Sequence, residues 1–284
     1  MCYRKFMAHL TSIVIPNRNY APLLPGLFDS IAAQTSGLSG VEAVFADDAS
    51  SDGSFEAASR LGQSLPLARF QAASFAPMGH PGLTRNAGAA LARGDLLVFL
   101  DADDQLEPGF LSSMVRTVES GADVAYCDYT EHGPGGERAV GLPDFDPDLL
   151  ATQNIATMGA IMRREVFEAL GGFRDNTAYE DWDFWVRAAH RGFRFAHVST
   201  PLYRYRHHGM NFSVKAQAQD GPAKAAIVAN TPEFFPPEVR RWASGVLDGK
   251  GWAQPFGRGL IPREEDVRRL REIWSEARKT RRAP

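Results

Sequence analysis

Cysteine and long apolar runs are both scarce in this sequence. Cys2 and Cys127 are its only cysteines, and no CxxC pair or Cys/His cluster accompanies them. The sequence therefore indicates neither a disulfide framework nor a thiolate zinc site, and a reducing cytosol is the natural compartment. No stretch approaches the ~20 apolar residues that span a bilayer. The short apolar run near the start continues into an expected core strand, unlike a cleavable signal.

An excess of positive charge is also absent. The 284 residues contain 31 Lys and Arg against 34 Asp and Glu, which gives a formal net charge of -3 and a pI near 6.2. Binding to DNA or RNA in general needs a broad positive field, so no nucleic-acid partner is expected. With 44% hydrophobic residues, the chain can bury a sizeable core as one large domain or one domain with appendages.

The first half of the chain alternates short apolar runs with helical patterns. This alternation is typical of a parallel sheet with crossover helices and predicts an α/β fold. The expected strands lie at 12–15, 41–46, 96–100, 124–127 and 158–162, and the expected helices at 23–31, 54–61, 84–94, 108–118, 164–170 and 180–191.

Two regions depart from this alternation. From Glu131 to Pro147 the residues Gly, Pro and Asp are frequent, which predicts a long loop, and long loops often carry function. After about Gln217 the alternation ends and prolines recur. We therefore expect a main domain over residues 1–216 and a mostly helical or irregular appendage over residues 217–284.

The end of the chain predicts an amphipathic helix. Val267, Leu270 and Ala277 share one face with either Ile273 or Trp274, and seven arginines and lysines between residues 268 and 282 lie elsewhere. A basic amphipathic helix can lie on an acidic membrane surface, which would give a peripheral contact with the inner face of the membrane. The interpretation that the sequence favours is a helix docked on its own domain with a solvated outer face.

The strongest chemical signal is the motif LDADD at residues 100–104. Its carboxylates directly follow an apolar strand, and no cation stands nearby in the sequence to balance them. At the carboxyl end of a strand in an open α/β sheet, where ligands usually bind, such dense oxygen ligands suit Mg²⁺ or Mn²⁺. The alternative is a polar turn in which Asp103 or Asp104 caps a helix.

Two further acidic clusters stand at the ends of expected elements. ADDASSDGS at residues 46–54 places Asp47 and Asp48 at a strand exit, although Asp and Ser are also ordinary turn formers. Residues 179–183, YEDWD, open a helix. The helix dipole favours acidic residues there and would keep such a carboxylate ionised, as a general base requires.

Taken in order, these patterns resemble the large nucleotide-diphospho-sugar transferase family often called glycosyltransferase family 2. The likeness covers roughly residues 10 to 213 and implies the family's GT-A fold, in which helices flank a mixed, mostly parallel central sheet. The QxxRW element and the membrane spans of processive relatives are missing, which favours the addition of a single sugar. The matching pieces are SIVIPNRN at 12–19, SIAAQT at 30–35, FADDASSDGS at 45–54, GLTRNAGAALARGDLLVFLDADD at 82–104, GAIMRREVFEALGGF at 159–173, YEDWDFWVRAAHRGF at 179–193 and PLYRYRHHG at 201–209.

The resemblance implies which residues bind the nucleotide sugar. Pro16 and Asp48 match positions that line the pocket for the base and ribose, and a carboxylate there can accept a hydrogen bond from an imide N–H. Asn17 and Asn19 join them as candidates, although many relatives have Thr and Tyr directly after the proline, so base contacts here can differ. Arg85 matches a residue that reaches the nucleotide or its diphosphate. Its alternative role is a helix-start residue paired with a nearby carboxylate.

The resemblance also implies a divalent ion, Mn²⁺ or Mg²⁺, on the donor's diphosphate. Asp103 matches the direct metal ligand, and Asp101 matches a carboxylate that contacts the ribose or supports the ion. Asp104 would only orient them. His208 matches a histidine that in some relatives approaches the diphosphate or the metal, but the neighbouring residues 206–207 leave this assignment open.

Asp181 matches the family's catalytic base, which takes the proton of the acceptor hydroxyl. Glu180 would help to place Asp181 or contact the acceptor. The family then implies a single displacement that inverts the anomeric centre, with a UDP-sugar as donor and a saccharide or lipid-linked acceptor in surface polysaccharide or glycolipid assembly.

Trp182 and Trp185 fit either sugar stacking or core packing, and helical spacing favours the core for Trp185.

Two alternatives stay open. A sugar nucleotidyltransferase also uses acidic strand ends with Mg²⁺, but it needs a Gly-rich phosphate loop after the first strand, where this chain has IPNRNYAP at 15–22. A catalytically inactive binding module of the same fold is the alternative that is not an enzyme. The joint presence of Asp48, Asp101, Asp103 and Asp181 argues against it.

Overall fold

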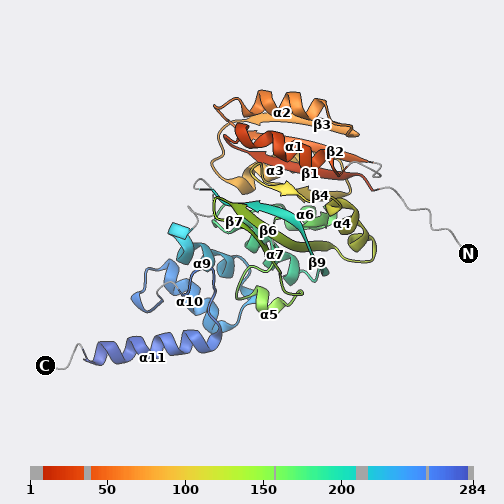
Figure 1. Cartoon of the computed structure of the whole chain (residues 1–284). Helices are drawn as coiled ribbons and strands as arrows, with labels where there is room; N and C mark the ends of the chain where they lie inside the picture. Colours follow the sequence, from red (N-terminus) through yellow and green to blue (C-terminus); the bar gives the residue numbers. More distant parts are fainter. Residues whose placement is uncertain (1–8, 35–39, 157, 209–216, 254–255, 281–284) are drawn as a thin grey trace, which may run out of the picture. The chain divides into compact units, whose positions relative to one another are not determined.

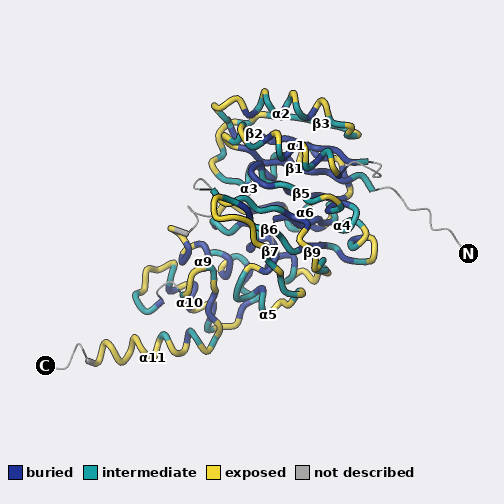
Figure 2. The backbone as a smooth tube through the Cα atoms, viewed as in Figure 1, coloured by how far each residue is buried: buried dark blue, intermediate teal, exposed yellow. Residues whose placement is uncertain are grey.

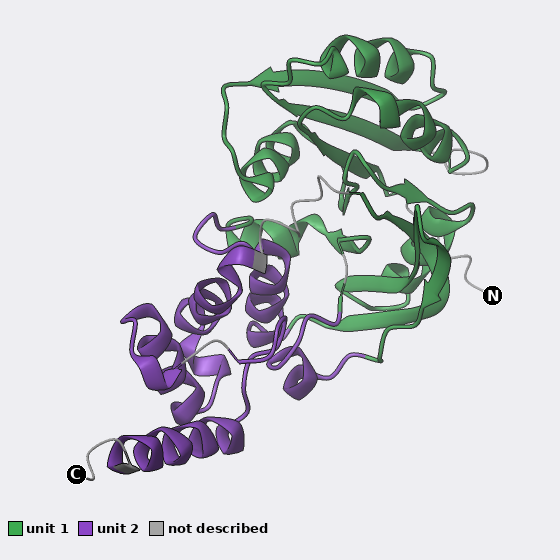
Figure 3. Cartoon of the chain, turned by 60° about the vertical axis from the view of Figure 1, so that its left-hand side comes forward, with its two compact units in different colours: residues 1–144, 156–173, 193–208 green, residues 145–155, 174–192, 209–284 purple. Residues whose placement is uncertain are grey.

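The computed structural model describes residues 9–34, 40–156, 158–208, 217–253 and 256–280. The chain forms two compact units (Figure 3): residues 1–144, 156–173 and 193–208 make the first, and residues 145–155, 174–192 and 209–284 make the second. The second unit thus takes two segments from earlier in the chain. Cys2 and the predicted domain boundary at residue 216 lie outside the described residues, and the division into 1–216 and 217–284 stays a prediction.

Nine strands of the described chain form the sheet of the first unit (Figure 1), in the order β3-β2-β1-β4-β8-β6-β9-β5 with β7 beside β6. Strand β1 pairs in parallel with β2 and β4, β2 with β3, and β6 with β9; the other pairs are antiparallel. The predicted mixed sheet is therefore confirmed. The strands are β1 (Thr11–Asn17), β2 (Val41–Asp48), β3 (Arg69–Phe75), β4 (Leu96–Phe99), β5 (Gln105–Leu106), β6 (Val124–Gly133), β7 (Gly136–Val140), β8 (Ile161–Arg163) and β9 (Phe195–Arg206).

Helices cover both faces of this sheet. The first unit contains η1 (Ala21–Leu23), α1 (Leu24–Ala32), α2 (Ser54–Gln63), α3 (Pro81–Leu91), α4 (Phe110–Glu119) and α6 (Arg164–Leu170). Strands β1 and β2 are buried along their whole length (Figure 2), because a sheet covered on both faces buries successive side chains on opposite sides. Ile13 and Ile15 join the core formed with α1, α2 and α4.

Helix α3 packs on the opposite face, and Gly88 permits the close approach. A Cβ atom at this position would lie 2.5 Å from Cγ1 of Val14 and 3.2 Å from Cβ of Ala46. A side chain here would therefore push α3 away from β1 and β2. The N-terminus of α3 begins after His80, whose Nδ1 accepts a hydrogen bond from the amide of Gly82.

The prediction of a long loop over Glu131–Pro147 is wrong for residues 131–140, whereas residues 141–146 have no regular secondary structure. Residues 131–140 form a β-hairpin in which β6 and β7 pair from Tyr129↔Val140 to Gly133↔Gly136. Pro134, Gly135 and Gly136 supply its tight turn, where Gly136 has φ +101°, while Gly141 and Pro143 stand in the irregular segment that follows β7. Sequence reasoning also missed β3 and β9, because neither shows the apolar run of a buried strand.

The second unit is helical, as the composition of the tail indicated. It contains α5 (Pro147–Leu150), α7 (Glu180–His190), η2 (Gln217–Gln219), α9 (Asp220–Asn230), η3 (Pro232–Phe234), α10 (Pro237–Leu247), η4 (Gly251–Ala253) and α11 (Glu264–Thr280). Trp182 and Trp185 are buried together with Trp242, so both tryptophans of α7 belong to the core. None of the helices in the described residues combines the length and the apolar character that a bilayer crossing requires.

Candidate functional site

The carboxyl ends of β1 and β2 are joined by a polar network around Asp47. Nδ2 of Asn17 donates to Oδ1 of Asp47 at 2.9 Å and to Oγ of Ser50 at 3.0 Å. Oδ2 of Asp47 accepts from the amide of Ser50 at 3.0 Å and from the hydroxyl of Ser74 at 3.2 Å. Asp47 therefore folds the turn, and the predicted ligand residue Asn17 is a member of this turn network.

Asn19 extends the same network. Its backbone adopts φ 61°, a left-handed conformation that Asn tolerates. Its amide donates to Oγ of Ser50 at 2.9 Å, and its Oδ1 accepts from the amide of Ser51 at 2.8 Å. The two loops that follow β1 and β2 are thus fastened to each other, which fixes the backbone around Pro16 and Asp48.

The Asp48 carboxylate is buried and already holds three donors. Its Oδ1 accepts from the amide of Met78 at 2.5 Å, and its Oδ2 accepts from the amide of Gly79 at 3.1 Å. Nη1 of Arg18 donates to Oδ2 at 2.9 Å, while the Arg18 side chain itself stays 49% exposed. Any ligand base that approaches Asp48 therefore meets a guanidinium as well as a carboxylate.

Arg85 and Asp101 form a bidentate ion pair between α3 and the end of β4. Nη2 of Arg85 donates to Oδ1 at 2.8 Å and to Oδ2 at 3.0 Å. Arg85 is 3% exposed, and its guanidinium lies 5.7 Å from the centre of the Phe173 ring. The pairing with a carboxylate that was the alternative role of Arg85 is therefore present. Asp101 keeps a 29% exposed side chain, so it can still accept from a ligand.

Asp103 faces His208 across the sheet. Oδ2 of Asp103 lies 2.8 Å from Nε2 of His208, and the ring of Tyr20 meets the imidazole edge to face at 5.5 Å. Burial raises the pKa of the Asp103 carboxyl, and the nearby charge of Asp101 raises it further, while His208 acts in the opposite direction. Burial and the charge of Asp101 thus disfavour the ionised form of Asp103, and a cation beside Asp103 would favour that form.

Asp104 is used entirely to hold β9. It is 2% exposed, and it accepts from the hydroxyl of Tyr203 at 2.7 Å and from the amide of Arg206 at 2.8 Å. Burial and the charges of its neighbours raise the pKa of Asp104 well above its usual range. Asp104 therefore brings the end of β9, and with it His208, to Asp103. The expectation that Asp104 only orients Asp101 and Asp103 stays a prediction.

The three consecutive polar residues at the end of β9 take different directions. His208 meets Asp103, Nε of Arg206 donates to the backbone oxygen of Asp103 at 3.0 Å, and Nε2 of His207 lies 3.3 Å from Oε1 of Glu131. Of these three side chains, His208 is the one whose ring stands beside the Asp103 carboxylate, and its role toward the metal or diphosphate stays a prediction.

These residues fit a divalent ion that a diphosphate would complete. Within the described residues no three His, Cys, Asp or Glu side chains converge into a ready metal cage, and Asp101 is engaged by Arg85. Asp103 and His208 offer an oxygen and a nitrogen at 2.8 Å separation. Mg²⁺ and similar ions are commonly held by one or two carboxylates together with substrate phosphates, so two protein ligands are sufficient.

The acidic cluster of α7 belongs to the second unit and divides into two roles. Asp183 is fully buried, with Nε of Arg187 at 2.8 Å from its Oδ2 and Nδ2 of Asn230 at 2.7 Å from its Oδ1. Asp181 is only partly buried. Nδ2 of Asn154 donates to its Oδ2 at 2.9 Å, and the amide of Trp182 donates to its Oδ1 at 2.7 Å. Asp183 is thus structural, and Asp181 is an oriented carboxylate at a helix N-terminus.

A buried network fixes the start of α7 against α9. The hydroxyl of Tyr179 donates to Oδ1 of Asp220 at 2.8 Å, and Nζ of Lys224 lies 2.5 Å from Oδ2 of Asp220. Lys224 is fully buried and also donates to the backbone oxygens of Phe256 and Gly257, each at 3.0 Å. Residues 179–181 therefore depend on this charge pair for their position.

Lys224→Met should destabilise the protein by roughly 3 kcal/mol, because it leaves the Asp220 carboxylate buried without its cation. Burial alone would raise the pKa of Asp220, but its hydrogen bonds from Lys224, Gly259 and Tyr179 outweigh burial and lower it. The stabilisation is therefore present above about pH 4 and lost as the pH falls through the folded-state pKa. Urea unfolding at neutral and acidic pH measures this. A Lys224→Met protein as stable as the wild type at neutral pH would refute it.

Sequence reasoning missed Tyr20, Tyr203 and Asn154. Tyr20 stands directly after the predicted Asn19, so its place in a loop at a strand exit was a usable signal. Tyr203 and Asn154 gave none, because each meets its acidic partner across a long separation: Tyr203 and Asp104 are 99 positions apart, and Asn154 and Asp181 are 27 apart. The predicted residues of the first unit assemble at strand ends, whereas Glu180 and Asp181 stand in the second unit.

Comparison with known proteins identifies the relatives of this chain. The model of the family described as "Glycosyl transferase family 2" matches residues 12–171. A PGL/p-HBAD biosynthesis glycosyltransferase of Mycobacterium tuberculosis is 33% identical over 63% of this chain and 70% of its own length. The chain spans 52% of the length of the first curated relative that it matches and 12% of the length of the second.

Two solved structures share the fold. Residues 1–349 of TarS from S. aureus, in complex with UDP-GlcNAc, superpose with a TM-score of 0.63 at 19% identity over 78% of this chain and 67% of that one. The mannosyltransferase PcManGT from Pyrobaculum calidifontis, in complex with GDP-Man and Mn²⁺, gives a TM-score of 0.63 at 16% identity over 96% of this chain and 81% of that one. The likeness confirms the predicted GT-A fold.

Proposed function

Since the chain belongs to glycosyl transferase family 2, we propose that it transfers one sugar from a UDP-sugar to a hydroxyl group of an acceptor. The observation that carries the proposal is the assembly at the carboxyl end of β4, where Arg85 holds Asp101 and His208 stands beside Asp103. The UDP-GlcNAc and GDP-Man bound by the two structural relatives support a nucleotide-sugar donor.

The residues at the carboxyl ends of β1, β2 and β4 form the proposed donor site. The base would lie against Pro16 and Asp48, with Arg18 offering a guanidinium to a carbonyl oxygen of the base. Asp101, held in place by Arg85, would accept from the ribose hydroxyls. The guanidinium of Arg85 keeps further N–H groups for the diphosphate.

Asp103 and His208 would hold Mn²⁺ or Mg²⁺, and the Mn²⁺ in the PcManGT structure supports a divalent ion here. When bound, such an ion neutralises the negative charge that builds on the departing nucleoside diphosphate. The protein's own part is to place the two ligands. Asp104 does so by fastening β9 through Tyr203 and the amide of Arg206.

Asp181 is the proposed catalytic base. Asp181 would take the proton of the acceptor hydroxyl as that oxygen attacks the anomeric carbon, and Glu180 would help to place the acceptor. Asn154 and the amide of Trp182 orient the two oxygens of Asp181, and the helix N-terminus favours its ionised form. Attack on the face opposite the leaving group inverts the anomeric centre.

The proposed setting is the assembly of a surface polysaccharide or glycolipid at the cytoplasmic face of a membrane. The acceptor would be a saccharide or a lipid-linked saccharide. The arginines and lysines in the second half of α11 support this setting, because they offer a means of peripheral contact with a membrane surface.

A thermal-shift panel of nucleotide sugars tests the proposal directly. One UDP-sugar is expected to raise the melting temperature in the presence of Mn²⁺ and to lose most of this effect when EDTA removes the metal. At a ligand concentration of about 100 times the Kd, binding adds ~2.7 kcal/mol of stability, which corresponds to a shift of roughly 5 °C. If no nucleotide sugar shifts the melting temperature with or without metal, the proposed donor site is wrong.

A further inference from the structure

Helix α11 carries an apolar stripe that continues past the part of the helix covered by protein. Val267 is fully buried and Leu270 is half-buried. One and two turns further on, Ile273 is 54% exposed and Trp274 is 39% exposed, and Ala277 is exposed as well. Figure 2 shows the outer part of the helix exposed throughout. The stripe therefore ends in solvent although its residues are of the kind that proteins bury.

Basic side chains flank the exposed stripe. Among the described residues, 268–279 contain five Arg and Lys against two Glu, and every residue from Arg271 to Lys279 is exposed. The acidic residues Glu264, Glu265 and Asp266 stand at the opposite, N-terminal end of α11. Residues 268–279 therefore carry a small net positive charge, whereas the first turn of α11 is acidic.

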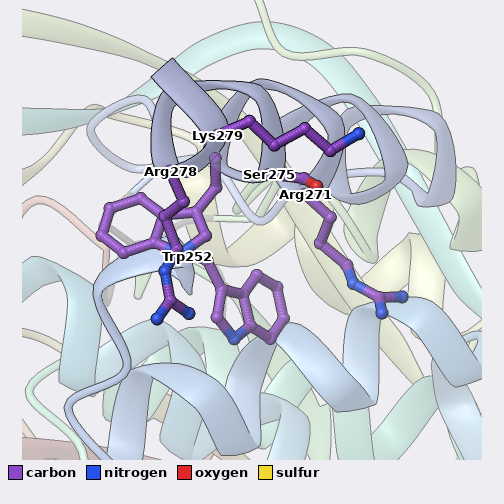
Figure 4. A pocket seen from close by; sticks show the side chains of 6 residues that line it. Trp252, Arg271, Ser275, Arg278 and Lys279 are labelled. Atoms are coloured by element: carbon purple, nitrogen blue, oxygen red, sulfur yellow. The ribbon is translucent and has the colours of Figure 1, made fainter. Parts of the chain in front are cut away.

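A pocket of about 520 Å³ opens between η4 and this part of α11 (Figure 4). The guanidinium of Arg271 lies 5.7 Å from the centre of the Trp252 ring, and its Nη1 lies 3.3 Å from Oε2 of Glu238. Trp274 packs onto Gly251, where a Cβ atom would lie 2.5 Å from Cη2 of the indole. The pocket is lined by Trp252, Arg271, Trp274, Ser275, Arg278 and Lys279.

We propose that α11 and this pocket dock the protein on an anionic bilayer, with a lipid phosphate in the pocket and Ile273 and Trp274 in the headgroup region. Indole rings prefer the interface between water and lipid, and clustered Arg and Lys are attracted to anionic lipids. Arg278 and Lys279 supply the phosphate donors at the mouth of the pocket, and the indole walls accept the adjoining apolar part of the lipid. These residues would contact the membrane whether or not the protein transfers sugars.

Charge complementarity favours this occupant over others. A nucleic acid would require a basic surface that extends over many phosphates, whereas the net charge of the chain is -3 and the basic residues that flank the stripe are confined to one helix. An acidic protein could pair with the basic side chains, but it would not explain why the neighbouring Ile273 is 54% exposed. A bilayer accepts both the cations and the apolar stripe in the same plane.

Vesicle sedimentation of the full chain tests the proposal. The protein is expected to bind vesicles of phosphatidylcholine with phosphatidylglycerol, to ignore phosphatidylcholine alone, and to bind more weakly as salt increases. Arg278→Glu with Lys279→Glu should weaken binding at least about tenfold. The matched control reverses two exposed arginines of the first unit, Arg60→Glu with Arg116→Glu, and should bind as the wild type does.

A second variant and a competitor separate the contributions. Ile273→Asn alters an exposed side chain without disturbing the fold, and it should weaken vesicle binding about as much in high salt as in low salt. Inorganic phosphate should compete no better than sodium chloride of equal ionic strength, since the site takes a phosphate only as part of a bilayer. If inorganic phosphate displaced the protein from vesicles, the ligand of the pocket would be a free anion and the proposal of a bilayer would be wrong.

Three results would overturn the proposal: equal binding to both vesicle types, wild-type binding by the charge-reversed pair, or self-association through α11 in place of vesicle binding, which would assign the surface to a second copy of the chain. The Arg278→Glu, Lys279→Glu protein should keep its Mn²⁺-dependent thermal shift with the nucleotide sugar. Loss of vesicle binding with this shift retained therefore separates the membrane site from the donor site.

Discussion

An Asp103→Ala variant is expected to lose Mn²⁺-dependent binding of the nucleotide sugar and on the order of 10³-fold in kcat/KM. Asp103 is the carboxylate that stands 2.8 Å from His208, and Asp101 is occupied by Arg85. Without Asp103, His208 would be the only protein ligand in this group. Stabilisation of the leaving group's charge is worth several kcal/mol, and each ~1.4 kcal/mol is a factor of ten in rate.

Calorimetry with the donor in Mn²⁺ and in EDTA measures this effect. Asp103→Asn keeps the size of the side chain and should show the same loss, which separates the metal role from a packing defect. Asp29→Asn makes the same chemical change at an exposed position of α1 and should leave binding unchanged. Metal-dependent donor binding of normal affinity in the Asp103→Ala protein would contradict the assigned role.

Asp181→Asn should leave donor binding largely intact and reduce turnover by about 10²- to 10⁴-fold, the usual contribution of a general base. The asparagine can keep the hydrogen bond to the amide of Trp182, so the start of α7 should retain its shape. What it lacks is the capacity to accept the acceptor's proton. The transfer assay should therefore show a lower kcat, while the thermal shift with donor and Mn²⁺ stays close to that of the wild type.

Asp183→Asn provides the contrasting control on the same helix. Asp183 is fully buried against Arg187, so its neutralisation should lower the melting temperature clearly, in contrast to Asp181→Asn. A stable Asp181→Asn enzyme with near-normal turnover would remove Asp181 from the proposed mechanism. If Asp181→Asn and Asp183→Asn lost turnover only in proportion to their loss of stability, Asp181 would likewise be removed from the proposed mechanism.

The strands and helices that were predicted correctly are those with strong local patterns. The apolar run at 96–100 indicated β4, and Leu24, Leu27, Phe28 and Ile31, at helical spacing, indicated α1. β3 and β9 were missed because their side chains are mostly half-buried or exposed and carry no apolar run. The hairpin at 131–140 was mistaken for a loop, because a two-residue turn contains the same Gly and Pro that a long loop would.

The sequence by itself determined the α/β class, the acidic motifs at the strand ends and the membership of glycosyl transferase family 2, because periodicity and motif spacing are local properties of the chain. Only the tertiary structure decided that His208 and not His207 meets Asp103, a pairing across 105 positions. It also decided that Asp183 forms a buried ion pair with Arg187 while Asp181 stays partly exposed. These choices depend on which distant segments pack together, and no spacing along the chain records the direction of a side chain across a sheet.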